Sequence, residues 1–336
     1  MPPVVKSRSP VSTAISLRRV VSIARRVSHA SYHAPICSCR LKFWLMWIDY
    51  ALRQALGGVG ALLRAPQLRV VARKSPARFP QEGSTVISLT SHGPRLKSAV
   101  VAISSLLVGT KRLPVYLWLD KEDYEGEWPK GLHALVEHGL KVRCSDGHYG
   151  PHTKYYGTFQ EFAGTGTRVI TVDDDMMYPK WFAEKLLNAS DADPKNVVAY
   201  RAHEIVLHDG RLAPYRQWKS VQDTNPDPRH FATGVSGVAY PPAMVDAVAA
   251  QGTAFQECAP HADDIWLNRC ALRAGHYVRQ VFPHPREFSM VPASQGVALV
   301  RGNLRGGTDA QLRATYAQED LELLLDAALS LNKPAR

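Results

Sequence analysis

The chain has 336 residues, of which 45% are hydrophobic and 21% are charged. This composition excludes a wholly disordered protein and leaves room for one large α/β domain with an appendage, or for two small domains. The net charge of the chain is +11, and its basic residues are concentrated in residues 1–80. Fourteen Lys and Arg residues and one acid, Asp49, give this segment +13 and leave −2 for the remainder. This distribution argues against a nucleic-acid-binding main domain, which would carry its own basic face.

The cysteines of the chain are Cys37, Cys39, Cys144, Cys258 and Cys270. Their odd number and scattered spacing predict no disulfide framework and favour a reducing, cytoplasmic compartment. Cys37 and Cys39 are too close together for the usual zinc knuckle, so we interpret this pair as incidental.

The most apolar stretch runs from Leu41 to Leu63 and contains Lys42, Asp49 and Arg53. These charges disfavour a helix that spans a membrane. Three interpretations stay open: a helix lying at the inner face of the cell membrane, with basic flanks drawn to anionic lipid, a helix packed on the domain, or an over-long predicted start of the chain. The Pro- and Gly-containing segment 65–84 is typical of a linker. We therefore predict a basic extension over residues 1–84 and a main domain over 85–336.

Strands and helices alternate along the main domain. Strands are predicted at Val86–Leu89, Val115–Leu119, Leu140–Arg143, Arg168–Val172 and Val197–Ala202, and helices at Arg95–Val108, Gly131–His138, Tyr155–Phe162, Pro179–Ala189 and from His261 to Gly275. This order favours an α/β fold with a mostly parallel sheet flanked by helices. Ligands gather beyond the carboxyl ends of strands in such sheets. The polar residues predicted at those ends are Thr90, Ser91, Asp120, Ser145, Asp173 and Asp175.

Three carboxylates, Asp173, Asp174 and Asp175, follow one buried strand directly. Because side chains alternate along an extended chain, Asp173 and Asp175 can point to one side and Asp174 to another. Like charges this close repel each other, and Mg²⁺ or Mn²⁺ relieves the repulsion and binds diphosphate oxygens at the same time. The alternative is that an Asp here caps the following helix, although a cap requires only one.

This segment resembles the DxD motif of bacterial family 2-like glycosyltransferases, which have the GT-A fold. The resemblance covers about residues 85–285. Its further motifs are Leu89-Thr90-Ser91 with Arg95, Gly150-Pro151 with Lys154, Tyr178-Pro179, Gly234, Gly237-Val238, Tyr240-Pro241-Pro242 and Ala262 to Leu267. It implies a Rossmann-like nucleotide-sugar-binding fold and transfer of a sugar from a nucleoside-diphosphate donor, most directly a UDP-sugar, with Mn²⁺ or Mg²⁺.

The resemblance also implies roles for individual residues. Asp173 would lie by the ribose or uracil of the donor. Asp173 and Asp175 would hold the metal, with His284 as a third ligand. The nucleotide or phosphate pocket would contain Thr90, Arg95, Lys154, Asp173 and Asp174. For Arg95 and Lys154 the alternative is an ordinary solvated side chain, and a lone His such as His284 is more often not a ligand.

A second acidic motif, Asp263-Asp264, opens the last predicted helix of the domain. A carboxylate there is suited to take the proton from an acceptor hydroxyl, and the resemblance implies such a base at this position. Asp264 is the first candidate and Asp263 the second, with inversion of configuration as the expected outcome. The alternative is that both acids stabilise the start of the helix.

Several other features have two interpretations. The small-residue stretch Phe231–Val238 either borders the sugar or forms a plain turn. Trp218 and Trp266 either stack on a sugar or pack in the core. The expected acceptor is a glycan or a lipid-linked molecule, as in polysaccharide biosynthesis. A metal-dependent phosphotransferase, a nuclease and a non-catalytic glycan-binding protein stay open as alternatives, although no G-x-x-x-x-G-K-[ST] loop is present.

Overall fold

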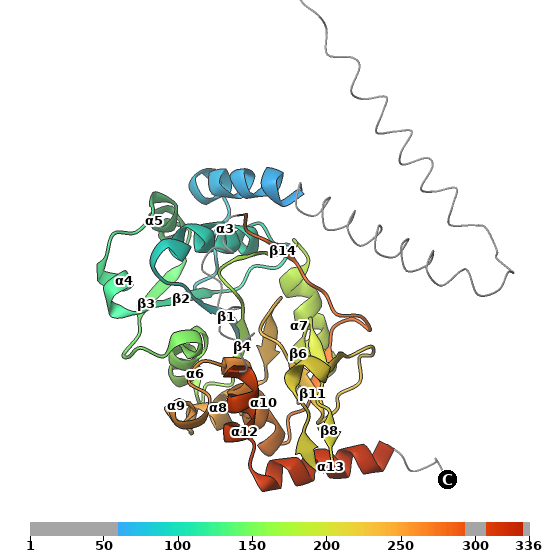
Figure 1. Cartoon of the computed structure of the whole chain (residues 1–336). Coiled ribbons are helices and arrows are strands. Elements are labelled where there is room, and N and C mark those ends of the chain that lie inside the picture. The colour runs from blue at the N-terminus through green and yellow to red at the C-terminus, as the bar shows by residue number, and fades with distance from the viewer. Residues whose placement is uncertain (1–59, 293–306, 332–336) are drawn as a thin grey trace, which may run out of the picture. The chain divides into compact units, whose positions relative to one another are not determined.

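The computed structural model describes residues 60–292 and 307–331, which build a mixed α/β structure around one central sheet (Figure 1). The strands of this sheet lie in the order β13-β6-β12-β4-β1-β2-β3. They are β1 (Thr85–Thr90), β2 (Val115–Leu119), β3 (Lys141–Cys144), β4 (Arg168–Thr171), β6 (Val197–Ala199), β12 (Val238–Tyr240) and β13 (Val278–Gln280). Neighbouring strands are parallel except where β12 pairs with β4 and β6. The predicted mostly parallel α/β sheet is therefore confirmed.

Helices cover both faces of the sheet because successive strand residues point to opposite faces. In β1, Ile87 packs in one core cluster and Val86 in the other. The cluster around Ile87 includes residues of α3 (Leu96–Leu107), α5 (Lys130–Glu137) and α7 (Phe182–Ala192). The cluster around Val86 includes residues of α6 (Tyr156–Phe162), α8 (Pro242–Ala249), α9 (Phe255–Cys258) and α10 (Asp263–Arg273).

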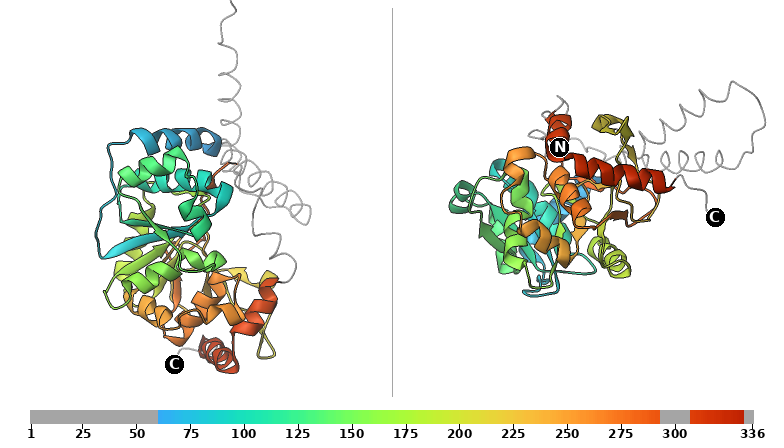
Figure 2. Two further views of the ribbon diagram at one scale, coloured as in Figure 1. Left: turned by 90° about the vertical axis from the view of Figure 1, so that its left-hand side faces the viewer. Right: turned by 90° about the horizontal axis from the view of Figure 1, so that it is seen from below.

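Smaller elements surround this core. The short strands are β5 (Met176–Met177), β7 (Ala202–Glu204), β8 (Leu207–His208), β9 (Arg211–Leu212), β10 (Lys219–Ser220), β11 (His230–Ala232) and β14 (Ser289–Met290). The remaining helices are α4 (Lys121–Glu125), α12 (Thr308–Thr315), α13 (Gln318–Leu331) and the 3-10 helices η1 (Gly93–Arg95), η2 (Gly150–Lys154) and η3 (Tyr215–Gln217). Figures 1 and 2 show α12 and α13 at the opposite end of the described domain from the helix of residues 60–74.

The antiparallel strand β12 decides where distant segments meet. Val238, the first residue of β12, pairs with Thr171, the last residue of β4. The chain therefore enters β12 at the same edge of the sheet at which it leaves β4. As a result, the segment that follows β4 and the segment that precedes β12 are neighbours in space.

Residues 60–74 are helical, so the prediction of a linker from residue 65 onward is wrong for residues 65–74. The Pro and basic residues suggested a linker, but Ala61, Ala65, Leu68 and Ala72 recur at helical spacing and are buried. This apolar stripe packs on the domain and overrides the local composition. The division of the chain at residue 84 stays a prediction, because residues 1–59 lie outside the described part.

Other predicted elements differ at their ends. The strand predicted at Val197–Ala202 is interrupted: β6 ends at Ala199, and β7 begins at Ala202 and pairs with β10 and β11 instead. The helix predicted from Pro179 begins at Phe182. Cys37, Cys39 and most of the apolar stretch from Leu41 lie outside the described residues. Within residues 60–292 and 307–331, no helix combines the length and apolarity needed to cross a membrane.

Candidate active site

The acidic triplet Asp173–Asp175 lies beyond the carboxyl end of β4, and hydrogen bonds fix its backbone. The Asp173 amide donates to the Tyr178 hydroxyl over 2.7 Å, and this hydroxyl lies 3.2 Å from the Asp173 carbonyl, to which it donates. The Val291 amide donates to the Asp175 carbonyl over 2.7 Å. Tyr178 is fully buried, so a residue of the core holds the turn in place.

Asp174 points into the protein, as the alternation of side chains predicts. Its carboxylate accepts a hydrogen bond of 2.6 Å from Ser91 Oγ and one of 3.0 Å from Arg95 Nε. Arg95 Nη2 contacts Asp174 Oδ1 and lies 3.1 Å from Asp175 Oδ2. Both oxygens of Asp174 are therefore occupied, and this residue holds the Arg95 guanidinium beside Asp175.

Lys154 joins the two acidic motifs. Its Nζ atom lies 2.8 Å from Asp173 Oδ1 and 3.2 Å from Asp263 Oδ2. The side chains of Lys154, Asp173 and Asp263 are 13%, 21% and 12% exposed, so the ion pairs are largely shielded from bulk water. We use the term acidic cluster for Asp173, Asp175, Asp263 and Asp264 together with Lys154 and Arg95.

The backbone of η2 places Lys154 between these carboxylates. Ser88 Oγ of β1 donates to the Lys154 carbonyl over 2.6 Å. On the other side of η2, the buried His152 ring lies 2.7 Å from the Ala259 carbonyl, which precedes α10. The 3-10 helix is thus bound both to the central sheet and to the segment that leads into the second acidic motif.

Asp264 is held by the loop that enters β12. The Gly234 amide donates to Asp264 Oδ1 over 2.9 Å. A Cβ atom at Gly234 would lie 2.9 Å from this oxygen and 3.1 Å from Lys154 Nζ, so only glycine leaves the cluster undisturbed. Gly237 has a φ of 99°, a conformation that glycine adopts without steric cost. The small-residue stretch therefore brings the backbone at Gly234 close to the acidic cluster.

Burial and charge shift the pKa values of the cluster. Burial opposes the charge of Lys154, but Asp173, Asp263 and Asp264 outweigh it and hold its pKa well above the usual value. Burial and the charge of Asp263 raise the pKa of Asp264 to about 7, although Lys154 acts in the opposite direction. Burial, Asp173 and Asp174 likewise raise the pKa of Asp175. A carboxyl group with a pKa near neutrality is suited to exchange a proton with a substrate.

Other predicted residues have different partners. Thr90 donates through its hydroxyl to the Trp118 carbonyl over 2.9 Å. His284 is exposed, and its Nδ1 atom lies 2.7 Å from Gln222 Oε1 rather than against the acidic cluster. Trp218 and Trp266 are buried in the core, which is the second of their two predicted interpretations. Across the described ranges, no three His, Cys, Asp or Glu side chains are grouped as a ready-made metal site.

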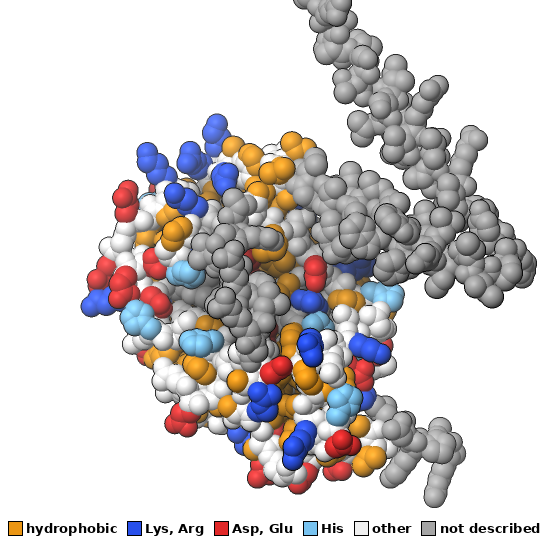
Figure 3. Space-filling view, in the orientation of Figure 1, with side chains coloured by type: hydrophobic (Ala, Val, Ile, Leu, Met, Phe, Trp, Pro, Cys, Tyr) orange, Lys and Arg blue, Asp and Glu red, His pale blue; other side chains and the backbone are white. Residues whose placement is uncertain are grey.

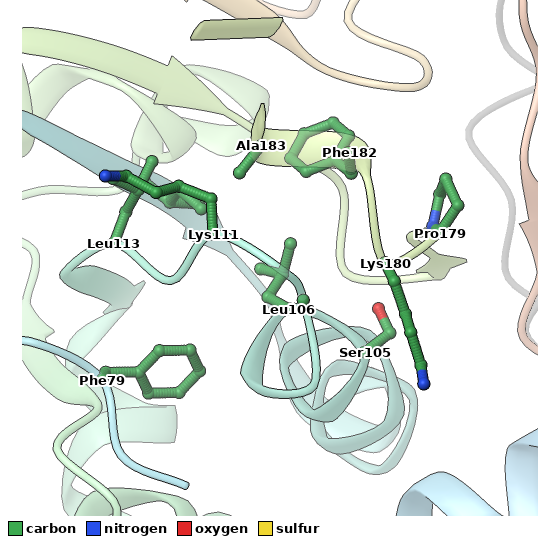
Figure 4. A pocket seen from close by; sticks show the side chains of 11 residues that line it. Phe79, Ser105, Leu106, Lys111, Leu113, Pro179, Lys180, Phe182 and Ala183 are labelled. Carbon is green, nitrogen blue, oxygen red and sulfur yellow. The ribbon is translucent and has the colours of Figure 1, made fainter. Parts of the chain in front are cut away.

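Two of the pockets in the described part of the chain are small, and each has room for about one water molecule. The pocket in Figure 4 lies between the end of α3 and the start of α7, and Lys111 and Lys180 at its rim extend in different directions. It shares no residue with the acidic cluster. The other pocket is lined mostly by apolar side chains together with Asp264 and Asn268, so it adjoins the candidate base.

Two contacts of the site were not predicted from the sequence. The sharing of Lys154 by Asp173 and Asp263 depends on how η2 packs against the segment before α10, and no local pattern signals it. The bond from Gly234 to Asp264 depends on the antiparallel pairing of β12. Glycine in a small-residue stretch is the one signal that pointed to this second contact.

No family model and no curated protein sequence matches the chain. Among solved structures, it is similar to residues 1–349 of S. aureus TarS, with 14% identity, a TM-score of 0.43, and coverage of 74% of this chain and 72% of that one. It is similar to the Pyrobaculum calidifontis mannosyltransferase PcManGT, solved with GDP-Man and Mn²⁺, with 15% identity, a TM-score of 0.39, and coverage of 84% and 86%. A third similarity is to 4-diphosphocytidyl-2C-methyl-D-erythritol synthase from Anaerococcus prevotii, with 12% identity, a TM-score of 0.41, and coverage of 74% and 97%.

Proposed function

We propose that this chain is a glycosyltransferase that moves a sugar from a nucleoside-diphosphate donor, most directly a UDP-sugar, to an acceptor hydroxyl. One observation carries the proposal: Lys154 bridges Asp173 and Asp263, so that the acidic motif of the strand end and that of the helix start form one cluster. The proton acceptor and the diphosphate site must lie close together, because the acceptor hydroxyl attacks the anomeric carbon as the nucleoside diphosphate leaves it.

The residues present fit a divalent cation. Asp173 Oδ1 pairs with Lys154 and Asp175 Oδ2 with Arg95, while the second oxygen of each carboxylate accepts no hydrogen bond from residues 60–292 or 307–331. Mg²⁺ and Mn²⁺ are commonly held by one or two carboxylates together with substrate phosphates and water. A cation would also relieve the crowding that raises the pKa of Asp175. We therefore propose Asp173 and Asp175 as ligands, and His284 as a ligand stays a separate prediction.

The bound metal would stabilise the negative charge that develops on the departing diphosphate. Lys154 and Arg95 would add fixed positive charge beside it, and Asp174 would keep the Arg95 guanidinium oriented. Thr90 is proposed to line the nucleotide pocket beyond β1. These side chains are held by buried partners, so little reorganisation would accompany the reaction.

Asp264 is proposed as the base that removes the proton from the acceptor hydroxyl as its oxygen attacks the anomeric carbon. Its pKa near 7 and its fixed position against the Gly234 amide suit this role. Asp263 is paired with Lys154 and would keep that cation in place. A single displacement of this kind inverts the configuration at the anomeric carbon.

The test is a panel of UDP- and GDP-sugars with Mn²⁺, in which release of the free nucleotide is measured. Asp175→Asn should reduce release at least about tenfold, which corresponds to ~1.4 kcal/mol of barrier. Asp191→Asn, at a carboxylate on α7 that is 66% exposed, is the control and should leave release unchanged. Calorimetry adds a second readout: UDP should bind more tightly with Mn²⁺ than without it. Equal affinity in both conditions would remove the metal from the proposal.

A further inference from the structure

The helix of residues 60–74 is apolar on two opposite sides. Its inner side, which includes Ala65 and Leu68, packs against Val101 of α3 and Met177 of β5. On its outer side, Leu62 is 61% exposed, Leu63 is 67% exposed and Val70 is 53% exposed. Leu63 and Val70 are seven residues apart and therefore lie on one line of the helix. The inner packing leaves this outer line without a partner among the described residues.

Three cations lie on the same outer side. Arg69, Arg73 and Lys74 are exposed in the same helix, as is Pro66 between the leucines and Val70. Figure 3 shows hydrophobic and basic side chains next to each other at the top of the view, where this helix lies in Figure 1. We call this surface the outer face; it consists of Leu62, Leu63, Pro66, Arg69, Val70, Arg73 and Lys74.

We propose that the outer face docks on a membrane surface that contains anionic lipid. Helices that lie in the interface bury an apolar line at the boundary of the acyl chains and keep basic residues near the lipid headgroups. The outer face has both components in one helix. The apolar packing of the inner side attaches that helix to the domain and leaves the outer face exposed, so docking requires no rearrangement of the fold.

Charge favours anionic lipid over two other candidates for covering the outer face, which are residues 1–59 and a second copy of the chain. Residues 1–59 carry nine Lys and Arg residues and a single acid, Asp49, so they have the same sign as Arg69, Arg73 and Lys74. A second copy of the chain in a symmetric contact would place these three cations opposite themselves. An anionic lipid surface complements both the outer face and the basic segment before it.

The helix is also bonded to the candidate site. Arg64 donates through Nη2 to the Tyr178 carbonyl over 2.6 Å and through Nη1 to the Met177 carbonyl over 3.3 Å. Tyr178 in turn holds the backbone of Asp173. Docking would therefore keep the acidic cluster at a fixed distance from the lipid surface. On the proposed function, this favours an acceptor that the membrane itself carries, such as a lipid-linked glycan.

The test is co-sedimentation of the full chain with phosphatidylcholine vesicles that contain roughly one third phosphatidylglycerol. The variant Leu63→Gln with Val70→Gln should bind at least about tenfold more weakly, because two apolar side chains no longer enter the interface. The matched control is Leu323→Gln with Leu329→Gln on α13, where the side chains are 47% and 63% exposed. This control should bind the mixed vesicles as the parent does. Vesicles of pure phosphatidylcholine should bind neither the parent nor the control strongly.

Three outcomes would overturn the proposal. The first is that the Leu63/Val70 variant binds vesicles as tightly as the parent chain. This comparison is also made at about 0.5 M salt, where binding by the other cations of the chain is screened. The variant could instead show a lower melting temperature with unchanged vesicle binding, which would mean that another segment of the chain covers the outer face. It could also change the mass in solution, which would mean that a second copy does.

The vesicle experiment and the donor experiment fail independently. The Leu63/Val70 variant should release nucleotide from the donor in vesicle-free solution as the parent does. Asp175→Asn should bind vesicles as the parent does. Loss of vesicle binding without loss of nucleotide release therefore isolates the docking surface from the proposed chemistry.

Discussion

Lys154 is the residue on which the proposed site depends most. Its ammonium group forms ion pairs with Asp173 and Asp263 at the same time. The charges of both and of Asp264 hold its pKa high, so it stays protonated throughout the working range of pH. Removing it would leave neighbouring carboxylates without a cation in a poorly hydrated place. Asp264 would respond first, since its pKa already lies near 7.

The pH dependence of the reaction should follow Asp264. A base must be deprotonated, so kcat/KM should rise with pH along a limb centred near 7, where burial and Asp263 place the pKa. Asp264→Asn should lower kcat at least about a hundredfold.

Neighbouring charges should shift the same limb. Asp263→Asn removes a charge that raises the pKa of Asp264, so the limb should move to lower pH. Lys154→Met removes a charge that lowers it, so the limb should move to higher pH. If neither Asp263→Asn nor Lys154→Met shifts this limb of the pH profile, Asp264 is not the base.

Gly234 offers a separate test of the same geometry. In Gly234→Ala the new Cβ would press on Asp264 Oδ1 and Lys154 Nζ, which are ends of side chains and can shift. We expect kcat/KM to fall about tenfold or more with little change in melting temperature, because a small displacement in a site costs much rate. The control is Gly83→Ala, whose Cβ would make only ordinary contact, at 3.4 Å from Pro114. Equal activity of both variants would contradict the proposed role of this approach.

At the scale of elements, hydrogen bonds and ion pairs fix α10 on two sides. Arg273 Nε lies 2.5 Å from Asp320 Oδ1 of α13, and Asp320 is fully buried. On the same helix, the Asn268 side chain donates to the His230 carbonyl of β11 over 3.0 Å and accepts a hydrogen bond from Tyr316. The helix that carries the proposed base is therefore positioned by α13 and by the strand that leads to Gly234.

Breaking these ion pairs should cost stability. Asp320→Asn removes the buried charge opposite Arg273 and Arg269, and we expect the free energy of unfolding in urea to fall by about 3 kcal/mol. Glu319→Gln is the control: this carboxylate is 78% exposed and lies 3.8 Å from Arg273, so its loss should change stability by less than about 0.5 kcal/mol. Similar losses in both variants would show that exposed charge, and not the buried pair, stabilises α10.

Periodicity predicts elements well where the hydrophobic pattern agrees with tertiary packing. The strand at Val115–Leu119 has the predicted ends because every one of its side chains is buried. The strand predicted at Val197–Ala202 is divided after Ala199, because local sequence does not reveal that the chain leaves one sheet for another. The helix of residues 60–74 was missed over its last ten residues because Pro66 and the cations obscured a stripe that consists mostly of alanine.

At the scale of the whole molecule, charge is separated along the chain. The excess of Lys and Arg lies in residues 1–80, while the remainder carries a small negative charge and the proposed acidic cluster. The described end of the basic segment forms the outer face of a helix attached to the domain. This separation is expected if one part of the chain meets an anionic surface and the other binds a cation and a diphosphate.

Residue chemistry and local spacing are sufficient to locate both acidic motifs and the α/β class of the fold, whereas Lys154 and Arg95 were indicated by the resemblance to glycosyltransferases. Those properties depend on neighbours within a few residues, where strand and helix periods act. The convergence of Asp173, Lys154, Gly234 and Asp264 is of another kind, because it depends on a strand that runs against its neighbours and on packing between segments far apart in sequence. Burial follows from that same packing, and so does the pKa near 7 that makes Asp264 the best candidate for the base.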